Sequence, residues 1–304
     1  MKDILTIIFR LTVACLLAGA VMGGAFVLTN QAKRHNAELN ERKVMLSLLG
    51  YSSVKSAPAS LKLHPIYRYL ITAKGGEEIG YLLPGGAGEA GMTLVIIDLD
   101  GKFVGQRPVA LSPEVAKEET KRAAAIQTAL GGDGKARYAD QTIVVTEGGQ
   151  RLAYLLPGRF PGFKTFITAM LALNQDFSIR GLEIMESEED PGLGGEIVQK
   201  YFKNQFKAKT LETMRKLGVV KTPLPDEYRR ALEADGGAGS GGLSAEQVAK
   251  IEAEYSGKDI YALTGATISS RSVTEGVKAM VQKFVYRLGL LDQALKEQKI
   301  AVPF

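Results

Sequence analysis

The longest apolar run of the chain lies close to its first residues, and it predicts a helix that crosses a membrane. Residues 11–28 contain no charged side chain. A helix of that length spans about 27 Å, and residues 4–9 extend it past the roughly 30 Å hydrocarbon core of a bilayer. We therefore expect a single transmembrane helix over residues 4–28, so that residues 1–29 anchor the chain in the lipid bilayer.

Two processed forms are the alternatives to this anchor. Residues 18–20 read Ala-Gly-Ala and fit the small-residue pattern of a signal-peptide cleavage site. The apolar run continues past that site to Leu28, which favours an uncleaved helix. A lipid-modified Cys15 is favoured less, because Thr12 stands where a leucine is wanted. The charged residues on either side of the helix do not decide on which side of the membrane the C-terminal domain lies. Their count favours the cytoplasm, but long domains cross the membrane largely regardless of the flanking charges.

The pattern then turns polar and afterwards breaks into short apolar runs. Residues 30–49 contain no Gly or Pro and predict a helix. We expect residues 30–75 to form a helical stalk and connector. The sequence YLLPG occurs at residues 81–85 and again at 154–158.

Each copy of YLLPG precedes a strand–turn–strand pattern, at residues 92–109 and 163–184, with Asp, Asn and Gly at the turns. We expect two β-hairpins, each entered through a Pro-Gly turn, that arose by duplication within one mixed or antiparallel sheet. Residues 76–150 then form the first half, residues 151–290 the second, and residues 291–304 a tail.

Helical patterns separate and follow these hairpins. A helix is expected over residues 113–130, with Glu118 and Arg122 as an ion pair four residues apart, and another over 196–207. Ser244 and Gln247 read as a capping box that opens a helix reaching residue 255. Residues 222–229 read as a linker, and the Gly-rich residues 235–242 as a flexible segment. The fold class predicted is α+β, with helices flanking the sheet.

The composition gives little support for several classes of metal site, catalytic site and binding partner. One Cys and two His give little support for an iron–sulfur cluster, a zinc site or a Ser/His/Asp triad. The net charge of +5 is spread over the chain without a basic run, so we do not expect a nucleic-acid partner. We expect no metal site and no catalytic residue in this chain.

One short polar motif remains, Thr264-Gly265-Ala266-Thr267, and an amphipathic helix follows it. The helix is predicted by an apolar stripe of Val273, Val277, Val281, Phe284 and Leu288. Ser269 and Ser270 are candidate N-cap residues. The free N–H groups and the positive end of the helix dipole suit a phosphate, and Gly265 permits a tight turn. On the residues alone, an ordinary helix cap is the favoured explanation of the motif.

The ordered combination of features is more specific than the motif alone. The chain resembles the G subunit family of the Rnf electron-transport complex and is similar to the C subunit of the sodium-pumping NADH:quinone reductase. The features that carry the resemblance are the helix at 4–28, the hairpin at 163–184, the loop Pro191-Gly192-Leu193-Gly194, and the TGAT motif followed by Ile268 and Ser269.

The resemblance implies a flavoprotein with FMN bound covalently, through a phosphoester, to Thr267. It also implies cofactor contacts from Thr264, Gly265, Ala266, Ser269, Gly192, Leu193 and Gly194. One departure is Tyr261, because the family usually has Asp three residues before the first residue of the motif. The nearest Asp here is Asp259.

The resemblance implies partners as well. They are the other subunits of a Rnf ion-translocating ferredoxin:NAD⁺ oxidoreductase, and a flavin transferase that attaches the FMN. The implied location is the cytoplasmic (inner) membrane, with a periplasmic C-terminal domain. Two alternatives stay open: a C-type subunit of a Na⁺-translocating NADH:quinone reductase, and a non-redox, membrane-anchored binding or scaffold module.

Overall fold

The computed structural model describes residues 2–73, 75–86, 91–132, 134–234 and 242–304. Most of the Gly-rich segment expected at 235–242 lies outside these residues. The chain divides into two compact units, Met1–Ser47 and Leu48–Phe304.

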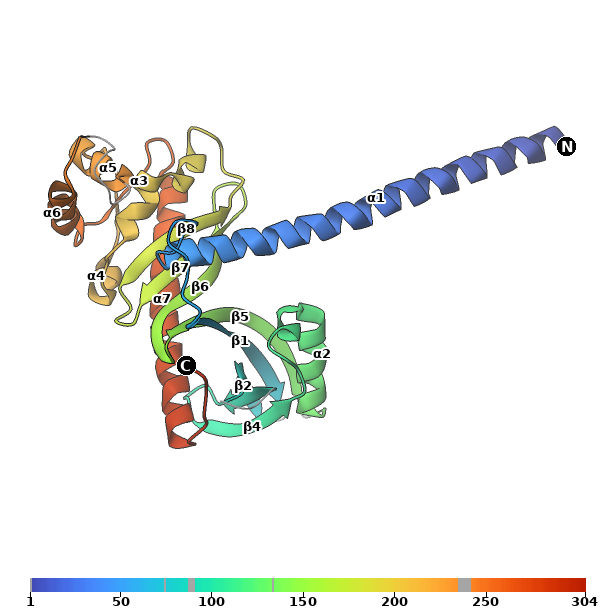
Figure 1. Ribbon diagram of the computed structural model, residues 1–304, viewed down its shortest axis with the longest axis horizontal. Helices are drawn as coiled ribbons and strands as arrows, with labels where there is room; N and C mark the ends of the chain where they lie inside the picture. Colours follow the sequence, from blue (N-terminus) through green and yellow to red (C-terminus); the bar gives the residue numbers. More distant parts are fainter. Residues whose placement is uncertain (1, 74, 87–90, 133, 235–241) are drawn as a thin grey trace. The chain divides into compact units, whose positions relative to one another are not determined.

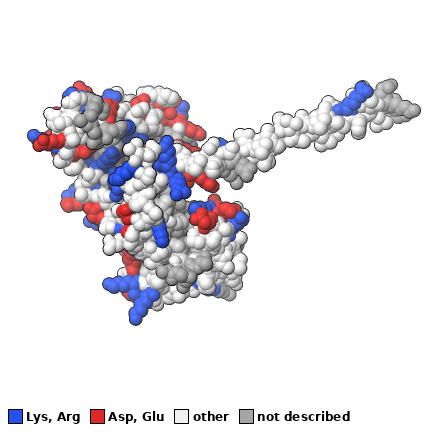
Figure 2. Space-filling model, viewed as in Figure 1, with Lys and Arg blue, Asp and Glu red and all other residues white. Residues whose placement is uncertain are grey.

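The first unit consists of helix α1, which runs from Lys2 to Leu48. Within the described residues it is the one helix long and apolar enough to cross a membrane. Figure 2 shows a long part of α1 without charged side chains. The helix continues beyond residue 28 without a break, as expected for a transmembrane segment that extends into a stalk.

The second unit is built on one antiparallel sheet of eight strands within the described residues. The strands are β1 (Leu61–Ala73), β2 (Gly76–Pro84), β3 (Met92–Ile97), β4 (Phe103–Val109), β5 (Gly134–Glu147), β6 (Gln150–Pro161), β7 (Phe166–Asn174) and β8 (Ile179–Glu186). Their order in the sheet is β4-β3-β2-β1-β5-β6-β7-β8. The α+β fold class is confirmed.

The sheet order supports the duplication expected from the YLLPG repeat. Strands β1–β4 and β5–β8 form two equivalent meanders that meet at the antiparallel β1–β5 pair. Each YLLP sequence lies in the second strand of its meander. Each meander is then followed by a proline, Pro113 or Pro191, and a 3₁₀ turn, η1 (Val115–Lys117) or η2 (Gly194–Val198). Both hairpins predicted from sequence, β3–β4 and β7–β8, are confirmed.

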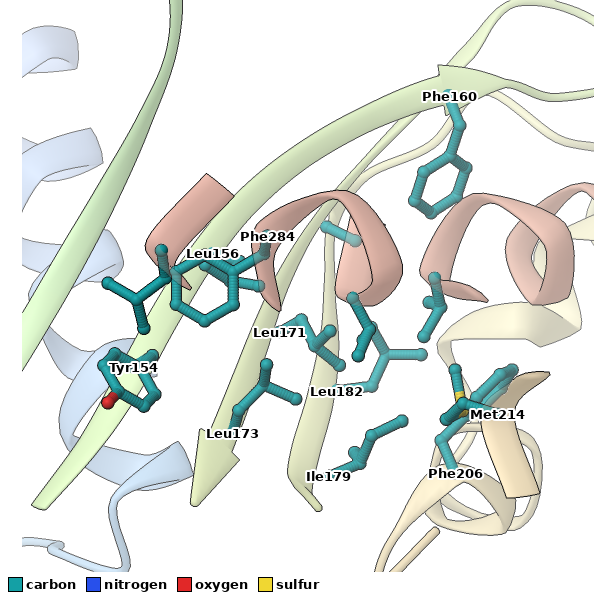
Figure 3. Packing of buried hydrophobic residues seen from close by; sticks show 14 of the residues in the cluster. Tyr154, Leu156, Phe160, Leu171, Leu173, Ile179, Leu182, Phe206, Met214 and Phe284 are labelled. Atoms are coloured by element: carbon teal, nitrogen blue, oxygen red, sulfur yellow. The ribbon is translucent and has the colours of Figure 1, made fainter. Parts of the chain in front are cut away.

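A long helix, α7 (Thr267–Glu297), covers one face of this sheet. It runs along the strands of both meanders in Figure 1. The predicted stripe from Val273 to Leu288 is buried in the cluster that joins α7 to the sheet. Figure 3 shows Leu156, Leu171 and Leu182 from three neighbouring strands turned toward the helix that carries Phe284. This packing fixes the start of α7 at one end of the second meander.

The opposite face of the first meander is covered by α2 (Glu119–Leu130), through Ile126 and Leu130. The expected Glu118–Arg122 ion pair is wrong. The Arg122 guanidinium is instead buried 4.1 Å from the Tyr67 ring centroid and donates to the Tyr69 hydroxyl. Glu118 pairs with Lys121. A sheet face lined by tyrosines offered the long Arg side chain a buried partner.

Other expectations also needed correction. Pro157-Gly158 is not a turn but lies inside β6, paired with Met170 and Ala169 of β7. A Cβ on Gly158 would lie 2.5 Å from the Met280 sulfur, so this glycine allows the close approach of α7. The range 30–75 is more than a stalk and connector, because residues 61–73 form β1.

The segment between the sheet and α7 contains short elements. The helix expected over 196–207 is broken into η2, α3 (Lys200–Lys203) and η3 (Asn204–Phe206), with extended backbone at Gln199. Next come α4 (Leu211–Lys216), β9 (Val219–Val220), α5 (Asp226–Glu233), α6 (Ala245–Tyr255) and β10 (Ile260–Tyr261). Helix α5 lies partly within the expected linker 222–229, and the capping box at Ser244 is confirmed.

Candidate functional site

The TGAT turn, residues 264–267, lies between β10 and α7 and is held by hydrogen bonds to a side chain of α7. Ile260 and Tyr261 pair in parallel with Val219 and Val220, which fixes the chain that leads into the turn. The Ser270 hydroxyl accepts from the Leu263 N–H and donates to the Ala266 carbonyl, at 3.0 Å in both cases. The turn is therefore built as part of the helix start.

Helix α7 begins at Thr267 itself, so the assignment of Ser269 and Ser270 as N-caps is wrong. The N-cap position is Ala266, which has no side chain able to accept from the first N–H groups. No acidic residue lies in the first turn. The 31-residue helix thus presents uncapped N–H groups and its positive dipole end at Thr267.

This helix start fits a phosphate group. Thr264 and Gly265 are exposed, and Thr267 is half-buried. Across the described residues, the Thr267 hydroxyl has no hydrogen-bond partner. An accessible hydroxyl beside uncapped N–H groups can be bonded to a phosphate whose charge those groups stabilise.

The PGLG loop, residues 191–194, lies against this turn. Gly265 has φ +76°, and a Cβ there would lie 2.8 Å from Leu193 Cδ2. The contact therefore depends on glycine, both for its backbone conformation and for the space. Leu193 is still 47% exposed, so its apolar surface remains open beside the turn. The structure thus brings together two motifs that are about seventy residues apart in the sequence.

Glu189, which the sequence analysis did not identify, connects the loop to α7. Its carboxylate is 8% exposed. Oε1 accepts from the backbone N–H groups of Phe163 and Lys164, at 2.7 and 3.2 Å, and Oε2 accepts from the Ser269 hydroxyl at 2.5 Å. The Ser269 hydroxyl is therefore already engaged, and what Ser269 offers a ligand is its backbone N–H.

The loop itself turns tightly around Asp190. The Asp190 carbonyl accepts from the N–H groups of Leu193 and Gly195, at 3.1 and 2.8 Å. Gly192 adopts φ +74°, which favours glycine. The Asp190 carboxylate forms an exposed ion pair with Lys164, 2.5 Å from Nζ to Oδ1.

Tyr261, which stands where the family usually has Asp, belongs to an aromatic cluster. Its ring centroid lies 6.3 Å from those of Tyr228 in α5 and Tyr255 in α6. Tyr228 and Tyr255 stack on each other at 4.1 Å. Burial raises the pKa of the Tyr228 hydroxyl. Tyr261 therefore packs the α5–α6 segment against the strand that precedes the TGAT turn.

Exposed apolar side chains lie on the segments that form the site. They belong to the β6–β7 turn, the start of β7, the PGLG loop, η2 and the first turn of α7: Phe163, Phe166, Leu193, Val198 and Ile268. A cleft of about 720 Å³ adjoins some of these segments and is lined in part by Arg159, Phe166, Glu188 and Val198.

The comparison with known families agrees with this geometry. Residues 162–282 match the family described as FMN-binding domain. That range begins at the turn that contacts Glu189 and ends within α7, so it includes the PGLG loop and the TGAT turn. Residues 162–282 are therefore similar to FMN-binding domains.

The chain is similar to components of two kinds of redox complex. It is 28% identical over 137 residues to the G subunit of the proton-translocating ferredoxin:NAD(+) oxidoreductase complex of Clostridium ljungdahlii, which covers 45% of this chain and 56% of that protein. It is 27% identical over 151 residues to the C subunit of the Na(+)-translocating NADH-quinone reductase of Yersinia pestis, covering 47% and 57%. The chain thus spans a little over half the length of these relatives.

Solved structures of the same kind of reductase component are also similar. NqrC from Shewanella oneidensis has a TM-score of 0.33 at 20% identity and covers 48% of this chain and 57% of that chain. The C subunit of the Na(+)-translocating NADH-quinone reductase from Parabacteroides distasonis has a TM-score of 0.35 at 18% identity, covering 64% and 75%.

Proposed function

We propose that this protein is a membrane-anchored electron-transfer subunit that carries FMN bound through a phosphoester to Thr267. The observation that carries the proposal is the match of residues 162–282 to FMN-binding domains, because this range includes the PGLG loop and the TGAT turn in contact. In this proposal, residues 151–290 form the FMN-binding half and the first half supports it. Residues 291–304 are not a separate tail, because α7 continues to Glu297 and Leu291 and Leu295 are buried in the core.

The residues of the turn divide the task of holding the phosphate. The uncapped N–H groups at the start of α7, including that of Ser269, bind its oxygens. Gly265 and Ala266 keep the approach clear of side chains, and exposed Thr264 borders it. Gly192 and Leu193 supply an exposed surface for the flavin ring, whereas Gly194 is buried and leaves room for the Glu189 carboxylate behind them.

Attachment is a phosphoryl-group transfer catalysed by a separate flavin transferase. The Thr267 oxygen bonds to the phosphorus of the FMN portion of FAD. The phosphoanhydride bond of FAD breaks, AMP leaves, and the threonine proton passes to a base of the transferase. Because the transferase supplies that base, Thr267 needs no neighbouring His or carboxylate of its own.

Bound FMN supplies reversible one- and two-electron chemistry, and the protein sets the position, solvent access and local charge of the ring. We propose that the electrons pass between other subunits of a Rnf-type ion-translocating ferredoxin:NAD⁺ oxidoreductase. The similarity to the G subunit of such a complex supports this assignment. The similarity to the C subunit of a Na⁺-translocating NADH-quinone reductase is evidence of the same kind for the alternative, in which the chain belongs to that complex.

The proposed attachment is tested by in-gel flavin fluorescence of the full chain, co-expressed with a flavin transferase. The wild-type band is expected to fluoresce after denaturation, and Thr267→Ala is expected to abolish the signal. Thr222→Ala is the matched control, because it removes an exposed threonine hydroxyl outside the TGAT turn and should keep the signal. A fluorescent Thr267→Ala band would refute the assignment.

The proposed location places α1 in the cytoplasmic membrane and the second unit on the periplasmic side. Val54 is 95% exposed and follows α1, so a Cys there is accessible to reagents. Val54→Cys in a Cys15→Ser background should react with a membrane-impermeant maleimide in intact cells. Labelling only after lysis would place the domain in the cytoplasm.

A non-redox scaffold is the second candidate, and Tyr261 in the place of the usual Asp favours it. The visible spectrum of the purified protein distinguishes the two. Flavin bands that dithionite bleaches would exclude a purely structural role, whereas a colourless protein made alongside an active transferase would support one.

A further inference from the structure

We propose that Glu189 is the positioning residue that fixes the orientation of the flavin ring, by holding the PGLG loop against the start of α7. This inference rests on the proposed attachment of FMN to Thr267. A phosphoester holds the cofactor at its phosphate end only, and a flexible ribityl chain separates that end from the ring. The ring orientation must therefore come from surfaces that are fixed relative to Thr267.

The loop surface nearest to Thr267 depends on the Glu189 carboxylate. Leu193 lies over Gly265 but remains half-exposed, so this contact alone is a weak restraint. The Lys164–Asp190 pair is exposed, and exposed pairs restrain little. The hydrogen bond between Glu189 and Ser269 is buried at both ends, since the two side chains are 8% and 2% exposed. A charge-assisted bond in such surroundings is short and strongly directional.

The carboxylate also joins a third segment, the β6–β7 turn. Its Oε1 accepts from the N–H groups of Phe163 and Lys164 in that turn. Glu189 thus joins the β6–β7 turn, the PGLG loop and the start of α7, the helix that begins at Thr267. Ionised carboxylates accept several hydrogen bonds at once, which an apolar side chain at this position cannot do.

Two glycines leave the space that this carboxylate occupies. A Cβ on Gly162 would lie 2.3 Å from Oε1, and one on Gly194 would lie 2.4 Å from Oε2. Both distances are below any normal contact. The carboxylate is therefore enclosed where it joins the turn, the loop and the start of α7.

The test compares flavin-loaded full-length variants by visible circular dichroism and flavin fluorescence anisotropy, which report how rigidly the ring is held. Glu189→Ala removes both carboxylate oxygens that accept hydrogen bonds. We expect it to abolish the visible circular dichroism and lower the fluorescence anisotropy of the flavin, while the fluorescent band of covalently bound flavin remains. Glu189→Gln keeps an acceptor for the two N–H groups and an amide for Ser269, so it should restore both signals. Glu275→Ala, an exposed carboxylate on α7 that does not line the cleft, is the matched control.

The outcomes separate this inference from the proposed function. A wild-type chain without a fluorescent band would overturn the attachment at Thr267. A loaded Glu189→Ala protein with wild-type dichroism and anisotropy would overturn the positioning role alone, and so would a Gln variant that behaves like Ala. If Glu189→Ala does not fold, Ser269→Ala removes only the link to α7, and it should reduce the dichroism without loss of the band. An unchanged Ser269→Ala spectrum would count against the proposal.

Discussion

The most discriminating stability prediction concerns Gly194, because an added methyl group there would meet the Glu189–Ser269 hydrogen bond. In Gly194→Ala, the new Cβ would lie 2.4 Å from Glu189 Oε2, 2.7 Å from Ser269 Oγ and 3.0 Å from Glu189 Cβ. The two oxygens end flexible side chains, but each is buried and held by the other. Relief of the clash therefore breaks their hydrogen bond.

The expected cost follows from these two effects. Overpacking costs typically about 1–3 kcal/mol, and loss of a hydrogen bond to a charged group costs about 1.5–3 kcal/mol. We expect Gly194→Ala to lower the free energy of unfolding by roughly 2–5 kcal/mol. Gly192→Ala, in the same loop, meets no atom within 4 Å. It should cost only the left-handed backbone penalty of about 1–2 kcal/mol.

The assay is urea unfolding of the full chain in detergent, followed by far-ultraviolet circular dichroism. A double-mutant cycle sharpens it, because Glu189→Ala removes Oε2, the atom nearest to the new methyl group, and frees the Ser269 hydroxyl to move away. In that background, Gly194→Ala should lose most of its cost, giving a coupling of about 1–3 kcal/mol. Additive effects of the two substitutions would refute the reasoning, since they would mean that Gly194 and Glu189 are not in contact.

Two further predictions test the packing and charge around the site. Lys209 is buried, and desolvation lowers its pKa from 10.5 to about 8 despite the attraction of Asp259. Between these two values the unfolded chain binds more protons than the folded chain, so stability should rise with pH, by up to about 3 kcal/mol. The measurement is the difference in urea midpoint between the wild type and Lys209→Met, taken at pH values below and above this window. A difference that does not change with pH would contradict a desolvated Lys209 with a lowered pKa. Val281 is fully buried between α7 and the sheet, so Val281→Ala should cost about 1–3 kcal/mol in urea unfolding, whereas exposed Gln282→Ala should change stability by under about 0.5 kcal/mol. Equal losses of stability from the two substitutions would contradict the assignment of Val281 to the buried face of α7 and Gln282 to its exposed face.

The sequence predicts those parts of the fold whose pattern repeats locally. The stripe from Val273 to Leu288 identifies the buried face of α7, and the pattern after each YLLPG copy identifies the two hairpins, β3–β4 and β7–β8. Strand β1 escaped prediction because its residues 66–69 are buried in succession, between the two core clusters, rather than alternating. The Pro-Gly of the second repeat lies within a strand because α7 requires a glycine there, a tertiary reason that local turn chemistry does not reveal.

The candidate site was predicted only in part for a similar reason. Glycine and hydroxyl residues indicate a phosphate turn when they are adjacent, as Thr264 to Thr267 are. Glu189 lies in the acidic run of residues 186–190, where nothing distinguishes the one buried carboxylate from its exposed neighbours. Its partners, Phe163 and Ser269, lie 26 and 80 residues away. The one available signal was the presence of glycine at both 162 and 194.

The central claim, FMN on Thr267, is tested most directly by mass spectrometry of the tryptic peptide that spans residues 259–271. This peptide contains Thr264, Thr267, Ser269 and Ser270, so fragmentation must identify the modified hydroxyl. The account predicts a peptide heavier by FMN less one water, with the added mass on Thr267. An unmodified peptide from protein made with an active flavin transferase, or an FMN group on Thr264, would contradict it.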